Sequence, residues 1–80
     1  MSEIQTADIR EAGWPMTLAG LVYETRAGAG MTQAQLAAAL ETSQSAVAAW
    51  ENGSRAPTVE ALERVARACG KRLHISIDVD

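Results

Sequence analysis

Residues 31–57 constrain the fold more than any other stretch, because they contain two separate signals for the start of a short helix. Thr32 precedes Gln35 by three residues, so the two can form a capping box in which each side chain bonds the other's backbone amide. Ser43 is a second N-cap residue and follows a break in the helical pattern at residues 41–42. The sequence therefore predicts two short helices joined by a turn of about three residues.

Apolar residues in both helices recur at helical spacing and predict one buried face on each. They are Leu36, Ala37 and Leu40 in the first helix, and Ala46, Val47 and Trp50 in the second. The outward face of the second helix is then formed by Gln44, Ser45, Ala48 and Ala49, and Asn52-Gly53 ends that helix. Two helices joined in this way form a helix-turn-helix, whose second helix can lie in the major groove of DNA.

This stretch resembles the Cro/cI-type helix-turn-helix family of phage and bacterial regulators, also called Xre. The residues that carry the resemblance are Thr32-Gln33, Ala37, Val47, Glu51-Asn52-Gly53 and Pro57. The resemblance spans about residues 18–70 and implies an all-α fold, a compact domain of four to five helices over residues 16–70. The sequence departs from the family at Glu41, where the family often has glycine for a positive φ; we expect either a cost of about 1 kcal/mol or a slightly different turn.

The resemblance also implies which residues contact DNA. Phosphate contacts are expected at Gln33, Ser43, Asn52, Ser54 and Arg55, which flank the second helix. Base contacts are expected at Gln44, which can pair with N6 and N7 of adenine, at Ser45, and at Ala48 or Ala49 through a thymine methyl group. The alternative for Gln44 and Ser45 is that they only satisfy amides at the start of the helix. Arg26 and Glu51 match a family ion pair with a structural role.

The last residues of the chain, from Leu73 to Asp80, alternate strictly between apolar and polar, which predicts a half-buried strand. One strand cannot satisfy its backbone alone, and the chain offers no second strand other than one that a few N-terminal residues could form. We therefore expect residues 71–80 to pair antiparallel in a two-fold homodimer that buries Leu73, Ile75, Ile77 and Val79. A dimer also suits the length, because 80 residues are near the lower limit for a core that is stable alone.

The remaining segments support the helix-turn-helix. Residues 1–15 are expected to form an arm with a short helix near residues 4–12, closed by Gly13 and Trp14-Pro15. The arm either packs Ile4, Ile9 or Trp14 onto the domain or binds a partner. One helix is expected on each side of residues 31–57, and each is expected to face a core of Leu, Val, Ile and Trp. The inward residues are Leu18, Leu21, Val22 and Thr25 in the helix before this stretch, and Val59, Leu62, Val65, Ala66 and Cys69 in the helix after it.

Composition excludes several classes of function. One cysteine and one histidine leave no intrachain disulfide or zinc-ligand set, and with no nucleophile–base pair or phosphate loop an enzyme or a cofactor is not expected. No apolar run reaches membrane-spanning length and no signal peptide is present, so a cytoplasmic protein is expected. The net charge of −3 disfavours DNA binding, but between Thr42 and Arg72 five basic residues outnumber three acidic ones.

Three functions fit these features. The favoured one is the antitoxin of a type II toxin-antitoxin pair, which represses its own operon as a DNA-bound dimer and neutralises a basic toxin; the chain resembles HigA- and HipB-like antitoxins. The second is a stand-alone homodimeric repressor on a palindromic operator. The third is a protein-interaction module without DNA binding, which the acidic charge and the alanine-rich second helix favour.

Overall fold

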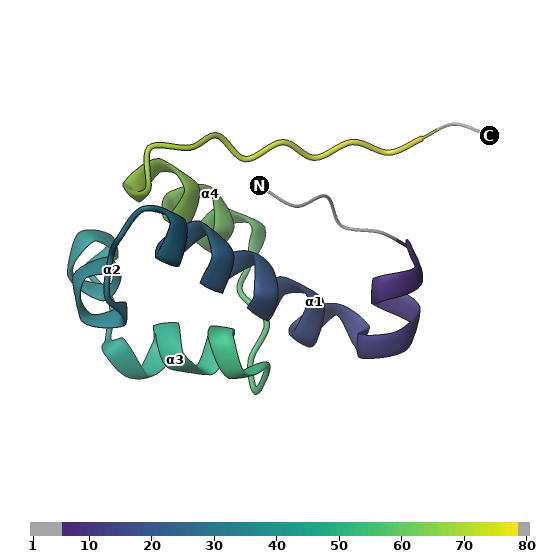
Figure 1. Cartoon of the computed structure of the whole chain (residues 1–80), viewed down its shortest axis with the longest axis horizontal. Helices are drawn as coiled ribbons and strands as arrows, with labels where there is room; N and C mark the ends of the chain where they lie inside the picture. The colour runs from purple at the N-terminus through teal and green to yellow at the C-terminus, as the bar shows by residue number, and fades with distance from the viewer. Residues whose placement is uncertain (1–5, 79–80) are drawn as a thin grey trace.

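The structure, a computed structural model, describes the backbone of residues 6–78 and the side chains of residues 13–78. Its four helices are α1 (Thr6–Gly28), α2 (Gln33–Leu40), α3 (Gln44–Asn52) and α4 (Val59–Ala68). In Figure 1, α3 lies below α1, α4 lies above it, and α2 closes one end of the domain. The expected all-α helix-turn-helix architecture is therefore confirmed for the described residues.

The first helix is broken at Gly13, whose φ of 75° and ψ of 167° are not helical. Pro15 follows within the first turn of the second part, where its missing N–H leaves no helical bond unmade. The sequence predicted a boundary at this point, between a short helix and one that begins at residue 16. The expected packing of Ile4 and Ile9 lies outside the described residues and side chains.

A single core joins the four helices. Both predicted faces of the helix-turn-helix are buried, and the cluster is completed by two residues of α1, Leu18 and Val22, and two of α4, Leu62 and Val65. Leu36, Val22 and Val47 are its largest fully buried side chains. Because α2 and α3 have only eight and nine residues, they could not persist as isolated helices, and their position depends on this burial.

Two expectations about the core were wrong. Val59 is 59% exposed although it shares the apolar stripe of α4. It is the first residue of that helix, and helical side chains lean toward the N-terminus, where no further turn of α4 exists to pack against. Trp14 is also exposed, at 54%, although a core with tryptophan was expected to include it. Ile75 and Ile77 are exposed in the single chain, and their expected burial in a dimer remains a prediction.

Beyond α4 the chain runs as an extended segment, residues 71–78, to which no regular secondary structure is assigned. Figure 1 shows it leaving the end of α4 in a nearly straight line, on the side of the domain opposite α3. Leu73 is half-buried against the core, whereas Ile75 and Ile77 are 60% and 89% exposed. The predicted strand and its pairing therefore remain predictions, and Val79 lies outside the described residues.

Candidate nucleic-acid interface

The two helices of the helix-turn-helix begin as the sequence predicts. The Thr32 hydroxyl accepts a hydrogen bond from the Gln35 amide at 3.0 Å, and the Gln35 side chain accepts one from the Thr32 amide at 2.8 Å, which completes the capping box. Ser43 caps α3 by accepting from the Ala46 amide at 3.1 Å. Since each cap satisfies amides that the helix leaves free, the start of both helices follows from local residues.

The turn between α2 and α3 closes on Glu41, which has a φ of 55° and a ψ of 42°. The Glu41 amide donates to the Ala38 carbonyl at 3.1 Å and the Thr42 amide to the Ala37 carbonyl at 2.9 Å, which is the Schellman arrangement. The left-handed conformation that the family usually assigns to glycine is therefore adopted here by glutamate, with the strain that a Cβ brings.

Arg64 of α4 adds a second restraint on the same turn. Its guanidinium donates a hydrogen bond to the carbonyl of Leu40, the last residue of α2. A cation at a helix C-terminus is favoured by the helix dipole as well as by the bond itself. The helix behind the motif therefore helps to hold the point from which α3 departs.

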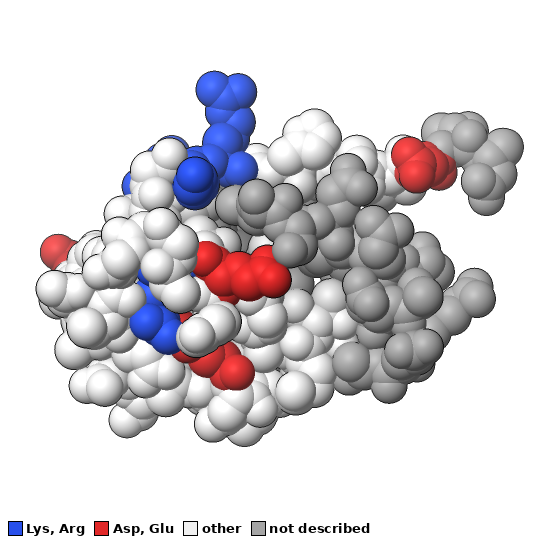
Figure 2. Space-filling view, in the orientation of Figure 1, with Lys and Arg blue, Asp and Glu red and all other residues white. Residues whose placement is uncertain are grey.

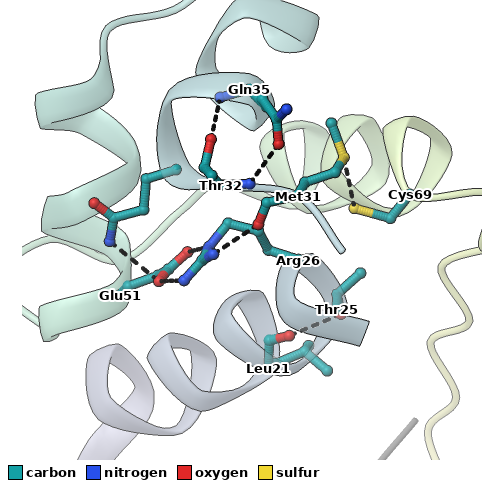
Figure 3. Close-up of polar contacts among 9 residues, drawn as sticks. Leu21, Thr25, Arg26, Met31, Thr32, Gln35, Glu51 and Cys69 are labelled. Atoms are coloured by element: carbon teal, nitrogen blue, oxygen red, sulfur yellow. Dashed lines mark hydrogen bonds and ion pairs between the residues drawn. The ribbon is translucent and has the colours of Figure 1, made fainter. Parts of the chain in front are cut away.

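Arg26 and Glu51 form the centre of the junction between α1, α2 and α3 (Figure 3). The guanidinium donates to both carboxylate oxygens, through Nε at 2.6 Å and a terminal nitrogen at 2.8 Å. Its other terminal nitrogen donates to the Met31 carbonyl at 2.8 Å. The two charged side chains are only 13% and 6% exposed, so this bidentate pair is largely shielded from water.

The environment of Glu51 favours its charged form. Burial raises the pKa of the Glu51 carboxyl, but hydrogen bonds from Arg26 and Gln33 and the charge of Arg26 outweigh that effect and leave the pKa below its ordinary value. The hydrogen bond to Glu51 likewise raises the pKa of Arg26. The pair is therefore charged at neutral pH, and it fixes the C-terminal end of α3 to the end of α1.

The outward face of α3 is accessible. Gln44 and Ser45 are exposed at its N-terminal end, and Ala48 and Ala49 are half-buried further along. No described residue makes a hydrogen bond to the side chain of Gln44 or Ser45. The amide of Ala46, at the start of α3, donates to the Ser43 hydroxyl instead, so the structure shows no hydrogen bond by which Gln44 or Ser45 satisfies a local amide. The amide of Gln44 is thus free to bind a ligand outside the domain.

The predicted phosphate-binding residues flank this face, and several have internal partners. Gln33 donates one of its two amide hydrogens to Glu51 at 3.2 Å, which leaves the other available. Ser43 uses its oxygen as a cap acceptor, so its hydroxyl hydrogen can still donate. Asn52 accepts from the Ser54 amide at 2.8 Å, and Ser54 in turn donates to the Ala49 carbonyl at 3.4 Å. The Arg55 side chain is exposed.

The basic side chains that this view shows lie in two places. Figure 2 shows one group at the top, over the end of α4 and the start of the extended segment, and a smaller patch at the left near α2, whereas the lower edge below α3 is mostly uncharged. The sequence places the exposed Lys71 and Arg72 at the start of that segment. Since Arg26 and Arg64 are engaged internally, Arg55 is the cation that the helix-turn-helix itself can offer to a phosphate.

The sequence did not predict the contacts of Arg64 with Leu40, of Gln33 with Glu51, or of Gly53 with Met16. At Gly53, the left-handed cap of α3, an added Cβ would overlap the sulfur of Met16 on α1. Each contact joins residues more than 15 positions apart, and no periodicity or spacing indicates such a pair. Sequence patterns detect caps and faces, whereas these contacts appear only when the helices are packed.

A model of the family described as helix-turn-helix matches residues 22–75, about two thirds of the chain. The match begins within α1 and includes α2, α3 and α4 with the start of the extended segment. No curated protein matches the chain. Within the described residues, no helix is both long and apolar enough to span a membrane.

Proposed function

The chain belongs to the Cro/cI-type (Xre) helix-turn-helix family of DNA-binding regulators, and from that premise we propose that it is a homodimeric, sequence-specific transcriptional repressor. The observation that carries the proposal is the free outward face of α3, where the exposed Gln44 and Ser45 have no partner among the described residues. Alanines beside them leave room for close approach of a base edge. The residues flanking α3 retain donors for phosphate oxygens on either side of a major groove.

Readout in this proposal depends on few side chains. Gln44 pairs with an adenine through N6 and N7, and Ala48 or Ala49 contacts a thymine methyl group. No arginine lies on α3, so each half-site is read weakly and specificity comes also from the spacing of two half-sites and from DNA shape. A palindrome with half-sites about one helical turn apart is the expected operator.

The test is selection of bound sequences from random duplex DNA, followed by titration of the selected site against scrambled DNA. Gln44→Ala is expected to reduce the discrimination between these two by about 1–3 kcal/mol per half-site, because it removes one bidentate base contact. Recovery of no enriched motif by the wild-type chain would refute sequence-specific binding and would favour a protein-interaction module instead.

Salt dependence tests the phosphate contacts separately. Arg55→Ala is expected to weaken binding to all sequences and to flatten the plot of log K against log salt by about one unit per half-site. Arg67→Ala is the matched control, because Arg67 is an exposed cation on α4 that pairs with Glu63 at 3.1 Å. An equal change of slope in both variants would show that Arg55 acts only through net charge.

Within this function, we propose that the repressor is the antitoxin of a type II toxin-antitoxin pair. The net charge of −3 supports a basic protein partner, and the extended segment offers surface that is free of α3. Co-expression with the product of the adjacent reading frame tests the proposal: growth arrest by that product alone and its relief by this chain are the expected results. If the adjacent product causes no growth arrest, the antitoxin role is refuted, whereas the proposed repressor function is unaffected.

A further inference from the structure

The side of α1 that faces away from the core carries an uncharged stripe. Four exposed residues, spaced four, three and four positions apart, share this face of the helix. They are Met16, Gly20, Tyr23 and Ala27. Large and small residues therefore alternate along the α1 stripe, and the two large ones, Met16 and Tyr23, are 52% and 53% exposed. The result is an apolar surface in which ridges alternate with hollows.

Both large side chains of the α1 stripe are held in place by contacts within the domain. The carbon of the Arg26 guanidinium lies 5.3 Å from the centroid of the Tyr23 ring, and Arg26 is itself fixed by Glu51. The sulfur of Met16 packs at Gly53, where an added Cβ would overlap it. Since both side chains are already ordered, burying them against another surface costs little further conformational entropy.

Gly20 lies between these two side chains, and the fold of the described residues does not require a glycine there. Its φ is not positive, and a Cβ built on it would lie in open space. Glycine inside a helix lowers stability relative to alanine, because it has more conformational freedom to lose on folding. A glycine that neither the backbone nor the internal packing requires leaves a hollow that another surface can approach closely.

We propose that the α1 stripe packs antiparallel on the α1 stripe of a second copy, with each Tyr23 over the partner's Gly20. Each Met16 then meets the partner's Ala27, so both large side chains enter hollows of the other copy. The occupant is a second copy because the alternation is self-complementary, and because the stripe carries no charge that would select DNA or a basic protein. This contact lies outside the DNA-binding function proposed above and does not require it.

The order of the residues selects the register. In a parallel pair in register, each Tyr23 would meet the partner's Tyr23, and no hollow would be filled. In an antiparallel pair centred on Gly20, Met16 would meet the carboxylate of the partner's Glu24. The register with Tyr23 over the partner's Gly20 is the antiparallel one that covers both large side chains with small residues of the stripe.

The size of the α1 stripe sets the strength of the contact. Two half-exposed side chains of this size offer roughly 100 Å² each, and the stripe with its flanks offers on the order of 300–400 Å² per copy. A stable complex buries about 800 Å² per partner, so the stripe alone does not hold a permanent dimer. It is sufficient for a weak association step at high protein concentration, which adds to the proposed homodimer.

Filling the hollow tests the proposal, with the weak association step measured by sedimentation equilibrium up to about 1 mM protein. Gly20→Leu is expected to weaken this step about tenfold or more, because the added side chain occupies the place of the partner's Tyr23. The domain is expected to remain folded in circular dichroism, since the new side chain points into open space and leucine is the better helix former.

Gly28→Leu is the matched control for this variant. Gly28 is also an α1 glycine with open space around it and no positive φ, but it lies off the stripe. We expect the control to associate within about twofold of wild type. An equal loss in both variants would overturn the proposal, because the effect would not depend on the stripe.

Exchanging the large and the small residue tests the register. Gly20→Tyr alone is expected to weaken the step about tenfold, because two rings then compete for one space. The double variant G20Y/Y23G again places a large residue opposite a small one, and it is expected to recover to within about threefold of wild type. No recovery would mean that positions 20 and 23 do not face each other, which overturns the register.

The outcomes separate this contact from the proposed repressor, because titration with DNA is carried out on the same variants. A wild-type chain without the weak step up to about 1 mM overturns the contact and leaves the repressor unaffected. A weak step that Gly20→Leu leaves unchanged also overturns it, and the stripe is then open to a different apolar partner. A chain that associates through the stripe but enriches no DNA motif keeps the contact and loses the repressor.

Discussion

Replacing Arg26 with methionine removes three hydrogen bonds while keeping an aliphatic side chain of similar length. Two of these bonds go to the Glu51 carboxylate and one to the Met31 carbonyl. The Glu51 side chain is 6% exposed in the wild-type structure, and among the described residues only Gln33, at 3.2 Å, would still donate a hydrogen bond to it. Removing one partner of such a buried pair costs about 3–5 kcal/mol. A domain of this size has about 4–12 kcal/mol in total, so the variant is expected to be close to unfolding.

The assay is urea denaturation followed by far-UV circular dichroism at pH 7, with Arg26→Met, Glu51→Leu and the double variant. The double variant is expected to be more stable than Arg26→Met, because replacing both charges leaves no unpaired buried ion. A favourable coupling energy of about 2–3 kcal/mol is expected from the double-mutant cycle. A cost below about 1 kcal/mol for Arg26→Met, with no coupling, would refute the view that this pair holds the three helices together.

The pH dependence of the same variants provides an internal check. The pKa of Glu51 is lowered in the folded state, so the stability it contributes is complete above the ordinary glutamate value of about 4.3 and is lost as the pH falls below it. The difference in unfolding free energy between wild type and Arg26→Met is therefore expected to become smaller in acid, because the Glu51 carboxyl that has lost its Arg26 partner becomes neutral. A gap that is the same at pH 7 and pH 3 would mean that the charge of Glu51 contributes nothing.

Three further substitutions test single restraints in thermal denaturation. Glu41→Gly is expected to stabilise the domain by about 1 kcal/mol by relieving the left-handed backbone, and a lower melting temperature would contradict this. Gly53→Ala is expected to lower the free energy of unfolding by about 1–2 kcal/mol, partly through the left-handed backbone and partly through overlap with the Met16 sulfur. Adding Met16→Ala is expected to recover only the part that comes from the overlap. Arg64→Ala is expected to cost about 1 kcal/mol by freeing the Leu40 carbonyl; no loss would show that this hydrogen bond does not contribute in solution.

Much of the fold could be predicted because its signals are local. Thr32 and Ser43 each cap a helix as expected, and Thr58 caps α4 in the same way, since a cap needs only the amides of the first turn. The buried faces of α2 and α3 followed from spacing, because a short helix that packs on a core turns every third or fourth residue toward it. The same logic was wrong for Val59, at the first position of α4, where periodicity continues but the packing surface ends.

The candidate DNA contacts could be predicted only in part. Resemblance selected Gln44 and Ser45, and the structure leaves both exposed on α3; their role in reading bases remains a prediction. The sequence did not indicate that Gln33 uses one amide hydrogen on Glu51, because that bond exists only when the start of α2 meets the end of α3. Net charge was also a poor guide, since it does not tell which arginines are engaged internally.

The sequence by itself determined where each short helix begins, which of its faces is buried, and that apolar and polar residues alternate over residues 73–80. These features depend on residues within about four positions of one another, so backbone hydrogen bonding and side-chain spacing suffice. Only the tertiary structure decided how the helices are held: Arg26 on Glu51, Arg64 on the end of α2, and Leu73 in the groove of α1 and α4. These contacts depend on packing, because only the packed helices bring residues distant in the chain to within a few ångströms. Once such polar groups are buried, a hydrogen bond between them compensates for the water that they lose.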